Sequence, residues 1–195
     1  MSFSNEAESL SKATPLRLIS PIPGFTRHAT SHDDKGEAII YSQTPGVWSS
    51  VGEDSIGFNV AYTTSKFPAE LSDEADIDEH DELLATEKLG LVSAGGSVCR
   101  VVDFEPANDP VMHRTQSLDY GIVLDGEIEL VLDSGDVRLL RKGDIALQRA
   151  TMHAWRNPSA TEWARMVFVL LDGNPLTAGR KLWRDDVPAV GVWAG

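Results

Sequence analysis

The chain has 195 residues, which is long enough for one domain with a sizeable core and short for two. Asp and Glu total 30 against 17 Lys and Arg, and the formal charge of −13 argues against binding to nucleic acid or to anionic membranes. A single cysteine, Cys99, excludes an intramolecular disulfide and a zinc site built from several cysteines.

The start of the chain lacks the features of a targeting segment. Residues 1–15 are mostly polar and acidic, so they predict a flexible lead-in and not a secretory signal. No apolar run anywhere in the sequence approaches the roughly 20 residues of a membrane-spanning helix. We therefore expect a cytoplasmic protein.

Residues 16–94 predict an N-terminal arm, a few strands and an acidic insertion. Two prolines within 18–25 disfavour a central strand there and favour an edge or an extended arm. A turn signal precedes a short strand at 38–41, and alternating apolar residues predict one or two further strands within 47–66.

The acidic insertion holds eight Asp and Glu between residues 70 and 82. It lacks the glycine and the flanking helices of an EF-hand, so it predicts a solvated surface loop in which His80 is also solvated. Leu83, Leu84 and Leu89, which follow, would suit a short helix.

Residues 95–172 alternate short apolar strands with tight turns. The predicted strands lie at 98–104, 121–124, 127–132, 137–140, 145–147 and 165–171. Strands that recur this closely, with glycine-containing turns and no long helices between them, predict an all-β sandwich or small barrel. Residues 173–195 predict a C-terminal tail packed on the barrel, with Trp183 and Trp193 as anchors.

Two histidines and one carboxylate form the candidate metal site. On an extended segment, His113, Thr115 and Asp119 have the same parity and face one interior. A second strand that brings His153 to the same interior completes two imidazoles and one carboxylate. Such a set binds a divalent transition metal, for example zinc, iron, manganese or nickel, and leaves positions open for a substrate.

The spacing around His113 resembles the first motif of the cupin family, G-x5-H-x-H-x(3,4)-E-x6-G. His113 takes the place of the first histidine, Asp119 that of the carboxylate, and Gly126 that of the last glycine. Thr115 stands where the second histidine is expected, and Ala107 stands where the opening glycine is expected.

The second cupin motif, G-x5-P-x-G-x2-H-x3-N, is matched by Gly143, His153 and Asn157. Gln148 and Ala150 replace its proline and its second glycine, and the first gap is one residue short. The resemblance covers residues 113–157. It implies a cupin double-stranded β-helix, or jelly roll, with an N-terminal extension and minor helical content.

The departures from the motifs weaken the metal site that the resemblance implies. Thr115 removes one imidazole, and a neutral hydroxyl is a poor ligand for a divalent metal. His113, Asp119 and His153 remain, which is similar to a facial triad of two histidines and one carboxylate. The alternative is a cupin that has lost its metal. In such a protein these residues would only form hydrogen bonds inside the barrel.

Further site candidates surround this set. Arg149 approaches His153 at an alternate position, and we assign it a catalytic role with Asp119 and His153. An arginine that points into an apolar cavity requires a carboxylate or an anionic substrate as its partner. The predicted substrate-binding residues are Thr115, Trp155, Tyr120 and Phe168, although the parity of Tyr120 favours packing.

These features predict a metal-dependent enzyme that acts on a small oxygenated organic molecule by lyase, dehydratase, decarboxylase or isomerase chemistry. An iron-dependent oxygenase and a cupin that binds a small molecule without turnover are the alternatives. A homodimer is expected, because an extended arm needs a surface to dock on and sheet edges favour pairing. Whether His32 on that arm joins the site stays open.

Overall fold

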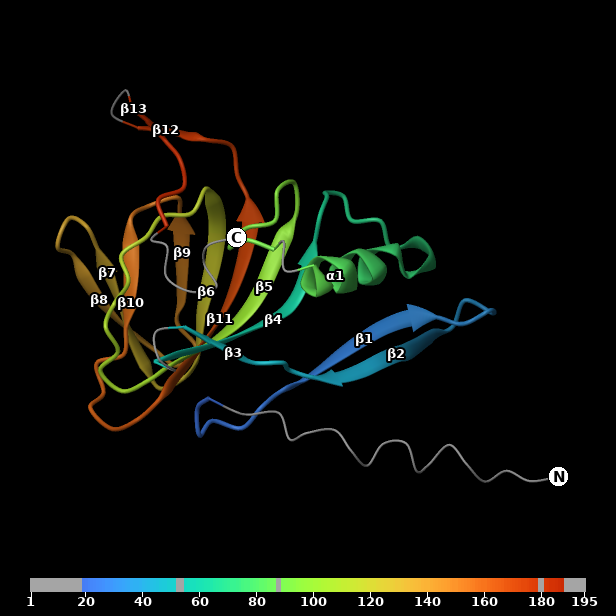
Figure 1. The fold of residues 1–195 in the computed structure, drawn as a ribbon, viewed down its shortest axis with the longest axis horizontal. Coiled ribbons are helices and arrows are strands. Elements are labelled where there is room, and N and C mark those ends of the chain that lie inside the picture. Colours follow the sequence, from blue (N-terminus) through green and yellow to red (C-terminus); the bar gives the residue numbers. More distant parts are fainter. Residues whose placement is uncertain (1–18, 52–54, 87–88, 179–180, 188–195) are drawn as a thin grey trace.

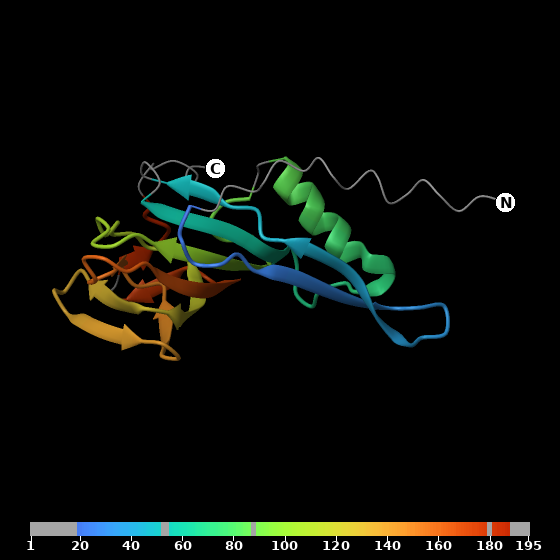
Figure 2. The same cartoon turned by 90° about the horizontal axis from the view of Figure 1, so that it is seen from below.

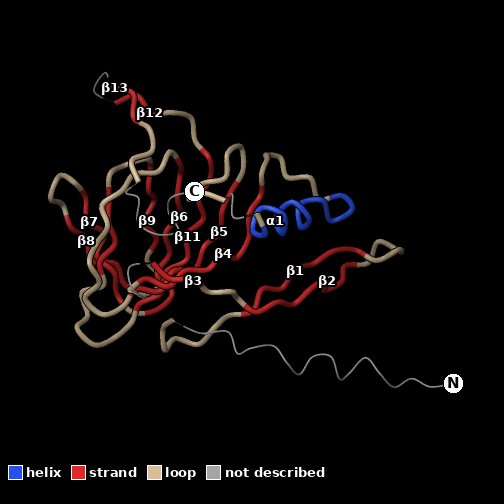
Figure 3. Tube along the Cα trace, viewed as in Figure 1, coloured by secondary structure: helices blue, strands red, loops and turns tan. Residues whose placement is uncertain are grey.

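A computed structural model describes residues 19–51, 55–86, 89–178 and 181–187. Strands dominate these residues, and α1 (Ala75–Ala85) is the one α-helix among them (Figure 3). The predicted all-β fold with minor helical content is therefore confirmed.

The larger of two facing sheets is antiparallel throughout. Its order is β3 (Ser49–Val51), β4 (Ile56–Thr64), β5 (Ser97–Phe104), β11 (Ala164–Asp172), β6 (Ser117–Asp125) and β9 (Ile145–Arg149). The strands predicted at 98–104, 121–124, 145–147 and 165–171 lie within these elements.

The smaller sheet forms the opposite wall of the barrel (Figures 1 and 2). Its order is β10 (His153–Arg156), β7 (Glu127–Leu132) and β8 (Val137–Arg141). Because alternate side chains of a strand face the same side, Ile128 and Trp155 of this sheet join Val102, Met166 and Phe168 of the larger sheet in one buried cluster. The core therefore lies between the two sheets.

A hairpin of β1 (Thr26–His32) and β2 (Ala38–Pro45) extends away from the barrel beside α1 (Figures 1 and 2). Residues 19–25, which contain the two prolines, form no strand. β12 (Leu176–Ala178) and β13 (Lys181–Trp183) form a small hairpin of the tail. Within the tail, the Trp183 ring lies 4.1 Å from the Arg114 guanidinium carbon, while Trp193 falls outside the described residues.

The acidic insertion differs from its prediction, because it forms a helix and not a solvated loop. A 3-10 turn (Ser72–Glu74) leads into α1, and His80 on this helix is fully buried. The His80 ring lies 4.7 Å from the ring of Tyr62 on β4, and its Nε2 contacts the Arg27 guanidinium on β1. The helix docks on β4 through His80 and through Asp76, which accepts a hydrogen bond from the Tyr62 hydroxyl, while Asp78, Asp81 and Glu82 are exposed. No helix in the described ranges is long and apolar enough to cross a membrane.

Candidate functional site

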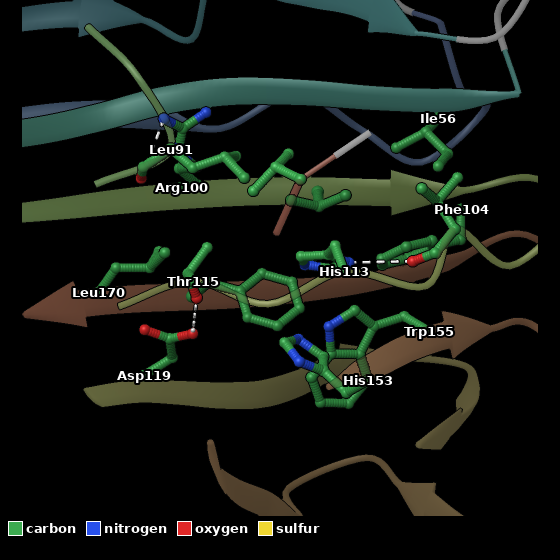
Figure 4. Close-up of a pocket in the computed structure, with 14 residues that line it drawn as sticks. Ile56, Leu91, Arg100, Phe104, His113, Thr115, Asp119, His153, Trp155 and Leu170 are labelled. Carbon is green, nitrogen blue, oxygen red and sulfur yellow. Dashed lines mark hydrogen bonds between the residues drawn. The ribbon is translucent and has the colours of Figure 1, made fainter. Parts of the chain in front are cut away.

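Backbone pairing brings the two motif histidines together. The His113 N–H donates to the His153 carbonyl at 2.8 Å, and the His153 N–H donates back at 2.9 Å. This bridge joins the segment before β6 to the start of β10. As a result, the two imidazole rings face each other with their centroids 4.3 Å apart (Figure 4).

Each ring is held in one tautomer by a backbone carbonyl. His113 Nδ1 lies 2.9 Å from the Val111 oxygen, and His153 Nδ1 lies 2.9 Å from the Thr151 oxygen. Because a carbonyl oxygen only accepts, both Nδ1 atoms carry the proton and both Nε2 atoms carry a lone pair. Burial lowers the pKa of both histidines, that of His153 to about 3, so both are neutral at physiological pH.

Asp119 lies on β6 and is only 5% exposed. The Thr115 hydroxyl donates to its Oδ2 at 3.2 Å, and Ser117 donates to Thr115 at 2.8 Å. Oδ1 has no hydrogen-bond partner among the described residues. Burial raises the pKa of Asp119 to about 6, although hydrogen bonds from Ser117 and Thr115 lower it in part. Asp119 is therefore a carboxyl group that exchanges its proton near neutral pH.

These groups line one small cavity of about 70 Å³ inside the barrel (Figure 4). Most of its wall is apolar and includes Ile56, Leu91, Val102, Phe104, Trp155 and Phe168. The Trp155 ring lies 5.4 Å from the His153 ring and 5.3 Å from the Phe168 ring. A Cβ on Gly121 would lie 2.9 Å from the Phe168 ring, so this glycine leaves room for the ring. The cavity is thus mostly apolar and shaped for a compact ligand.

The donor set fits a divalent transition metal in part. Two neutral imidazoles, each with an outer hydrogen bond that orients its ring, are suitable ligands. Within the described ranges, however, no three His, Cys, Asp or Glu side chains gather closely enough to hold an ion. Asp119 lies with Thr115 and apart from His153 (Figure 4). The predicted convergence of all three ligands is therefore not found in the structure, which offers two nitrogens.

Arg149 is exposed and does not line the cavity, contrary to its prediction. The parity argument assumed one continuous strand up to His153. Instead β9 ends at Arg149, and Ala150 has a left-handed backbone with φ of 51°. This turn directs Gln148 inward and Arg149 outward. Tyr120, at 38% exposure, also points away from the cavity.

The two alanines that replace motif glycines both have positive φ, 52° at Ala107 and 51° at Ala150. Glycine adopts this conformation without strain, whereas a Cβ makes it unfavourable. The spacing of the motif is therefore kept in the backbone even where its residue type is lost. Asn157, at the end of the second motif, is 1% exposed and donates to the carbonyls of Phe104, Glu105 and Glu162, so its role is structural.

Arg100 is not among the predicted site residues, yet it lines the cavity and is 5% exposed. Its position on β5 has the same parity as Val98, Val102 and Phe104, all of which are buried. An arginine at an alternating apolar position of a strand was the signal that could have found it.

Comparison with known proteins supplies the family. No family model matches the chain. The cupin-domain-containing oxidoreductase fogC of Aspergillus ruber is 40% identical over 175 residues, which cover 88% of this chain and 84% of that protein. This chain belongs to the cupin family. The cupin-domain-containing oxidoreductase virC of Hypocrea virens is 38% identical to it, over 88% of this cupin and 89% of virC.

A further relative comes from a biosynthetic gene cluster. Phomopsin biosynthesis cluster protein D of Diaporthe leptostromiformis is 42% identical over 185 residues, which cover 93% of this cupin and 91% of that protein. The similarity extends beyond the barrel motifs in all three relatives, since the aligned segments are longer than residues 113–157.

Proposed function

We propose that this cupin is an enzyme of small-molecule biosynthesis that transfers a proton on a small oxygenated compound held in the barrel. The observation that carries the proposal is the pairing of two fixed, neutral imidazoles with a buried carboxyl group of raised pKa in one apolar cavity. The names of the relatives, oxidoreductases and a biosynthesis cluster protein, support a role in such metabolism.

In this proposal His113 and His153 hold a divalent transition metal through their Nε2 atoms. The bound cation supplies Lewis-acid polarisation of a substrate oxygen. The protein's own part is to keep both Nδ1–H groups on the Val111 and Thr151 carbonyls, which prevents the rings from turning away. Zinc, iron and nickel suit imidazole ligands, whereas manganese favours oxygen ligands, and Thr115 is not among the donors.

Asp119 serves as the acid or base and not as a metal ligand. Thr115 fixes Oδ2, which leaves Oδ1 to accept or donate a proton at the substrate. A pKa near 6 lets the group change protonation state at neutral pH without a large penalty. Trp155 and Phe168 exclude water, so that the proton passes between Asp119 and the substrate.

Isomerisation, elimination and decarboxylation all contain such a proton transfer. The proposal includes these three non-redox reaction types. The second candidate is an iron-dependent oxygenase. It is favoured by the names of the relatives, four of which are called oxidoreductases. The third is a binding cupin without turnover.

The experiment combines element analysis with two activity assays. Protein purified without added metal is analysed for bound metals, then incubated in deuterium oxide with a panel of small aldehydes and ketones. Deuterium incorporation next to a carbonyl, seen by proton NMR and lost in Asp119→Asn, supports proton transfer. Consumption of dioxygen without deuterium incorporation supports the oxygenase. Metal uptake or ligand binding without either reaction contradicts the enzyme proposal.

We also propose a homodimer. The exposed apolar residues Ile40 on β2 and Ile145 and Leu147 on the edge strand β9 are exposed by 56%, 60% and 60%. Exposed apolar surface beside an open sheet edge is a common feature of interfaces. Light scattering at micromolar concentration tests this, and a monomer mass contradicts it.

A further inference from the structure

Two buried arginines on adjacent strands differ in how their charge is balanced. Arg165 on β11 pairs with Asp103 in a two-pronged ion pair, with nitrogen–oxygen distances of 2.6 and 2.7 Å. It also donates to the Pro23 carbonyl at 2.7 Å. Arg100 on β5 is equally buried, yet no carboxylate pairs with it in the part of the chain that the structure describes.

Arg100 nevertheless keeps its charge and a fixed position. Its Nη2 donates to the carbonyls of Gly90 and Leu91, and its guanidinium carbon lies 6.0 Å from the centre of the Phe58 ring. Its Nε is buried and has no hydrogen-bond partner among the described residues. Burial is the cause that lowers the pKa of Arg100, to about 10, so the group is still a cation at neutral pH.

A buried cation without a counter-charge costs free energy, and structures keep one only where something offsets that cost. Arg100 lines the same cavity as the two histidines and Asp119. In Figure 4 it lies beside Leu91, on the far side of the cavity from His153. Arg100 also borders a second pocket, beside Phe58 and Asp81. In the cavity that it shares with the two histidines and Asp119, a charged partner would meet the reacting groups as well.

We propose that Arg100 binds an anionic oxygen of the ligand, so that this cupin selects small carboxylates over neutral molecules of the same shape. The inference deepens the proposed function, because it names the charge of the substrate for that site. The Nε–H of the guanidinium would donate a hydrogen bond to the anionic oxygen. The oxygenated, reacting part of the molecule would then extend toward His113, His153 and Asp119.

The test compares two probes of matched shape, butyrate and butyramide, by calorimetric titration of the full chain with its natural metal content. We expect butyrate to bind at least about 10-fold more tightly than butyramide, because a charge-assisted hydrogen bond is stronger than a neutral one. Arg100→Met should lose this preference and retain the affinity for butyramide. Arg100→Lys should keep part of the preference, since it keeps the charge and loses the planar fork.

A carboxylate can also bind a metal, so His153→Gln is measured in parallel. A preference for butyrate that survives His153→Gln and disappears in Arg100→Met supports the inference. A preference that disappears with His153 and survives Arg100→Met places the anion at the histidine end and overturns it. Equal affinity of the wild type for both probes, or no binding of either, also overturns it, whatever the metal analysis and deuterium assays show.

Thermal unfolding distinguishes a binding role for Arg100 from a structural one. Without ligand, Arg100→Met should unfold at about the same temperature as the wild type. The removal of an unbalanced buried charge offsets the loss of the hydrogen bonds to the Gly90 and Leu91 carbonyls. Arg165→Met is the matched control, and it should unfold at a clearly lower temperature because Asp103 is left unpaired. A similar loss of stability in both variants shows that Arg100 holds the fold, and it contradicts the inference.

Discussion

The two ends of the cavity contain different chemistry within one apolar wall. At one end His113 and His153 face each other as neutral bases, and at the other the pKa of Asp119 is raised to about 6. Burial disfavours the charged form in both places, so it lowers the pKa of the imidazoles and raises that of the carboxyl group. The same physical effect thus leaves lone pairs at one end and a proton donor or acceptor at the other.

The comparison teaches that residues adjacent in a family motif need not share a role. His113 and Asp119 belong to one motif segment, yet only His113 is placed beside His153. Asp119 is instead oriented by Thr115, the residue that replaces the second motif histidine. The residue that replaces the second motif histidine is thus the one that holds Asp119 away from the imidazole pair.

The largest effect should follow removal of one imidazole. His153→Gln is expected to lower metal affinity at least about 100-fold, because it removes one of two nitrogen ligands. Titration with cobalt or nickel followed by absorbance measures this. His32→Gln on the exposed hairpin is the matched control and should bind metal as the wild type does. Equal affinity in both variants would refute the assignment of His153.

Asp119→Asn should leave metal binding intact and slow the reaction. We expect a loss of about 100-fold in deuterium incorporation, the usual contribution of a general acid or base. The acid limb of the pH–rate profile near pH 6 should also disappear, since that limb reports the Asp119 carboxyl group. A variant that loses its metal along with its activity would show that Asp119 is a ligand.

In metal-free protein, the free energy of unfolding should depend on pH in opposite ways for Asp119 and for His153. The folded pKa of Asp119 is about 6 against an ordinary value of 3.8, so its contribution to stability falls as pH rises from 3.8 to 6. Its charge then costs about 3 kcal/mol at pH 7. His153, with a folded pKa of about 3 against 6.5, has the opposite effect, and its contribution is lost as pH falls from 6.5 toward 3.

Asp119→Asn should therefore be more stable than the wild type at pH 7, and the difference should shrink as pH falls toward 4. Urea unfolding at pH 7, 5 and 4 measures this. In acid, wild-type His153 takes up a proton on unfolding, which lowers the free energy of unfolding. Glutamine takes up no proton, so His153→Gln should lose less stability as pH falls. A difference between Asp119→Asn and the wild type that is constant with pH would contradict the raised pKa of Asp119.

The smallest effect concerns the turn that leads from β9 to the histidine end. Ala150→Gly should raise the free energy of unfolding by about 1 kcal/mol, because it relieves a left-handed conformation at a residue with a Cβ. Ala146→Gly, at a buried position within β9, is the control and should lower it. Chemical unfolding measures both. A destabilising Ala150→Gly would show that its Cβ has packing contacts that outweigh the strain.

Much of the barrel could be predicted from the sequence, because local patterns determine it. Alternating apolar residues and glycine turns indicated the strands from 98 to 171, and motif spacing indicated that His113 and His153 lie on one interior. The position of Asp119 relative to the histidines could not be predicted, because parity gives the side of a strand but not the distance across a cavity.

Other features depended on tertiary contacts. The acidic insertion forms a helix whose His80 and Asp76 contact Tyr62 on β4, and no pattern within the insertion shows these contacts. The turn at Ala150 breaks the parity between Arg149 and His153, whereas the parity of Arg100 on β5 places it among buried residues. Sequence reasoning anticipated that an inward arginine would need an anionic partner, and the structure shows that the inward residue is Arg100.

The most direct test of this division between the two ends is anomalous diffraction from crystals soaked with cobalt or zinc, collected at the absorption edge of the metal. The account predicts one peak about 2.0–2.1 Å from the Nε2 atoms of His113 and His153, with both Asp119 oxygens beyond ligand distance. A peak coordinated by Asp119, or no peak at the imidazole pair, would contradict it.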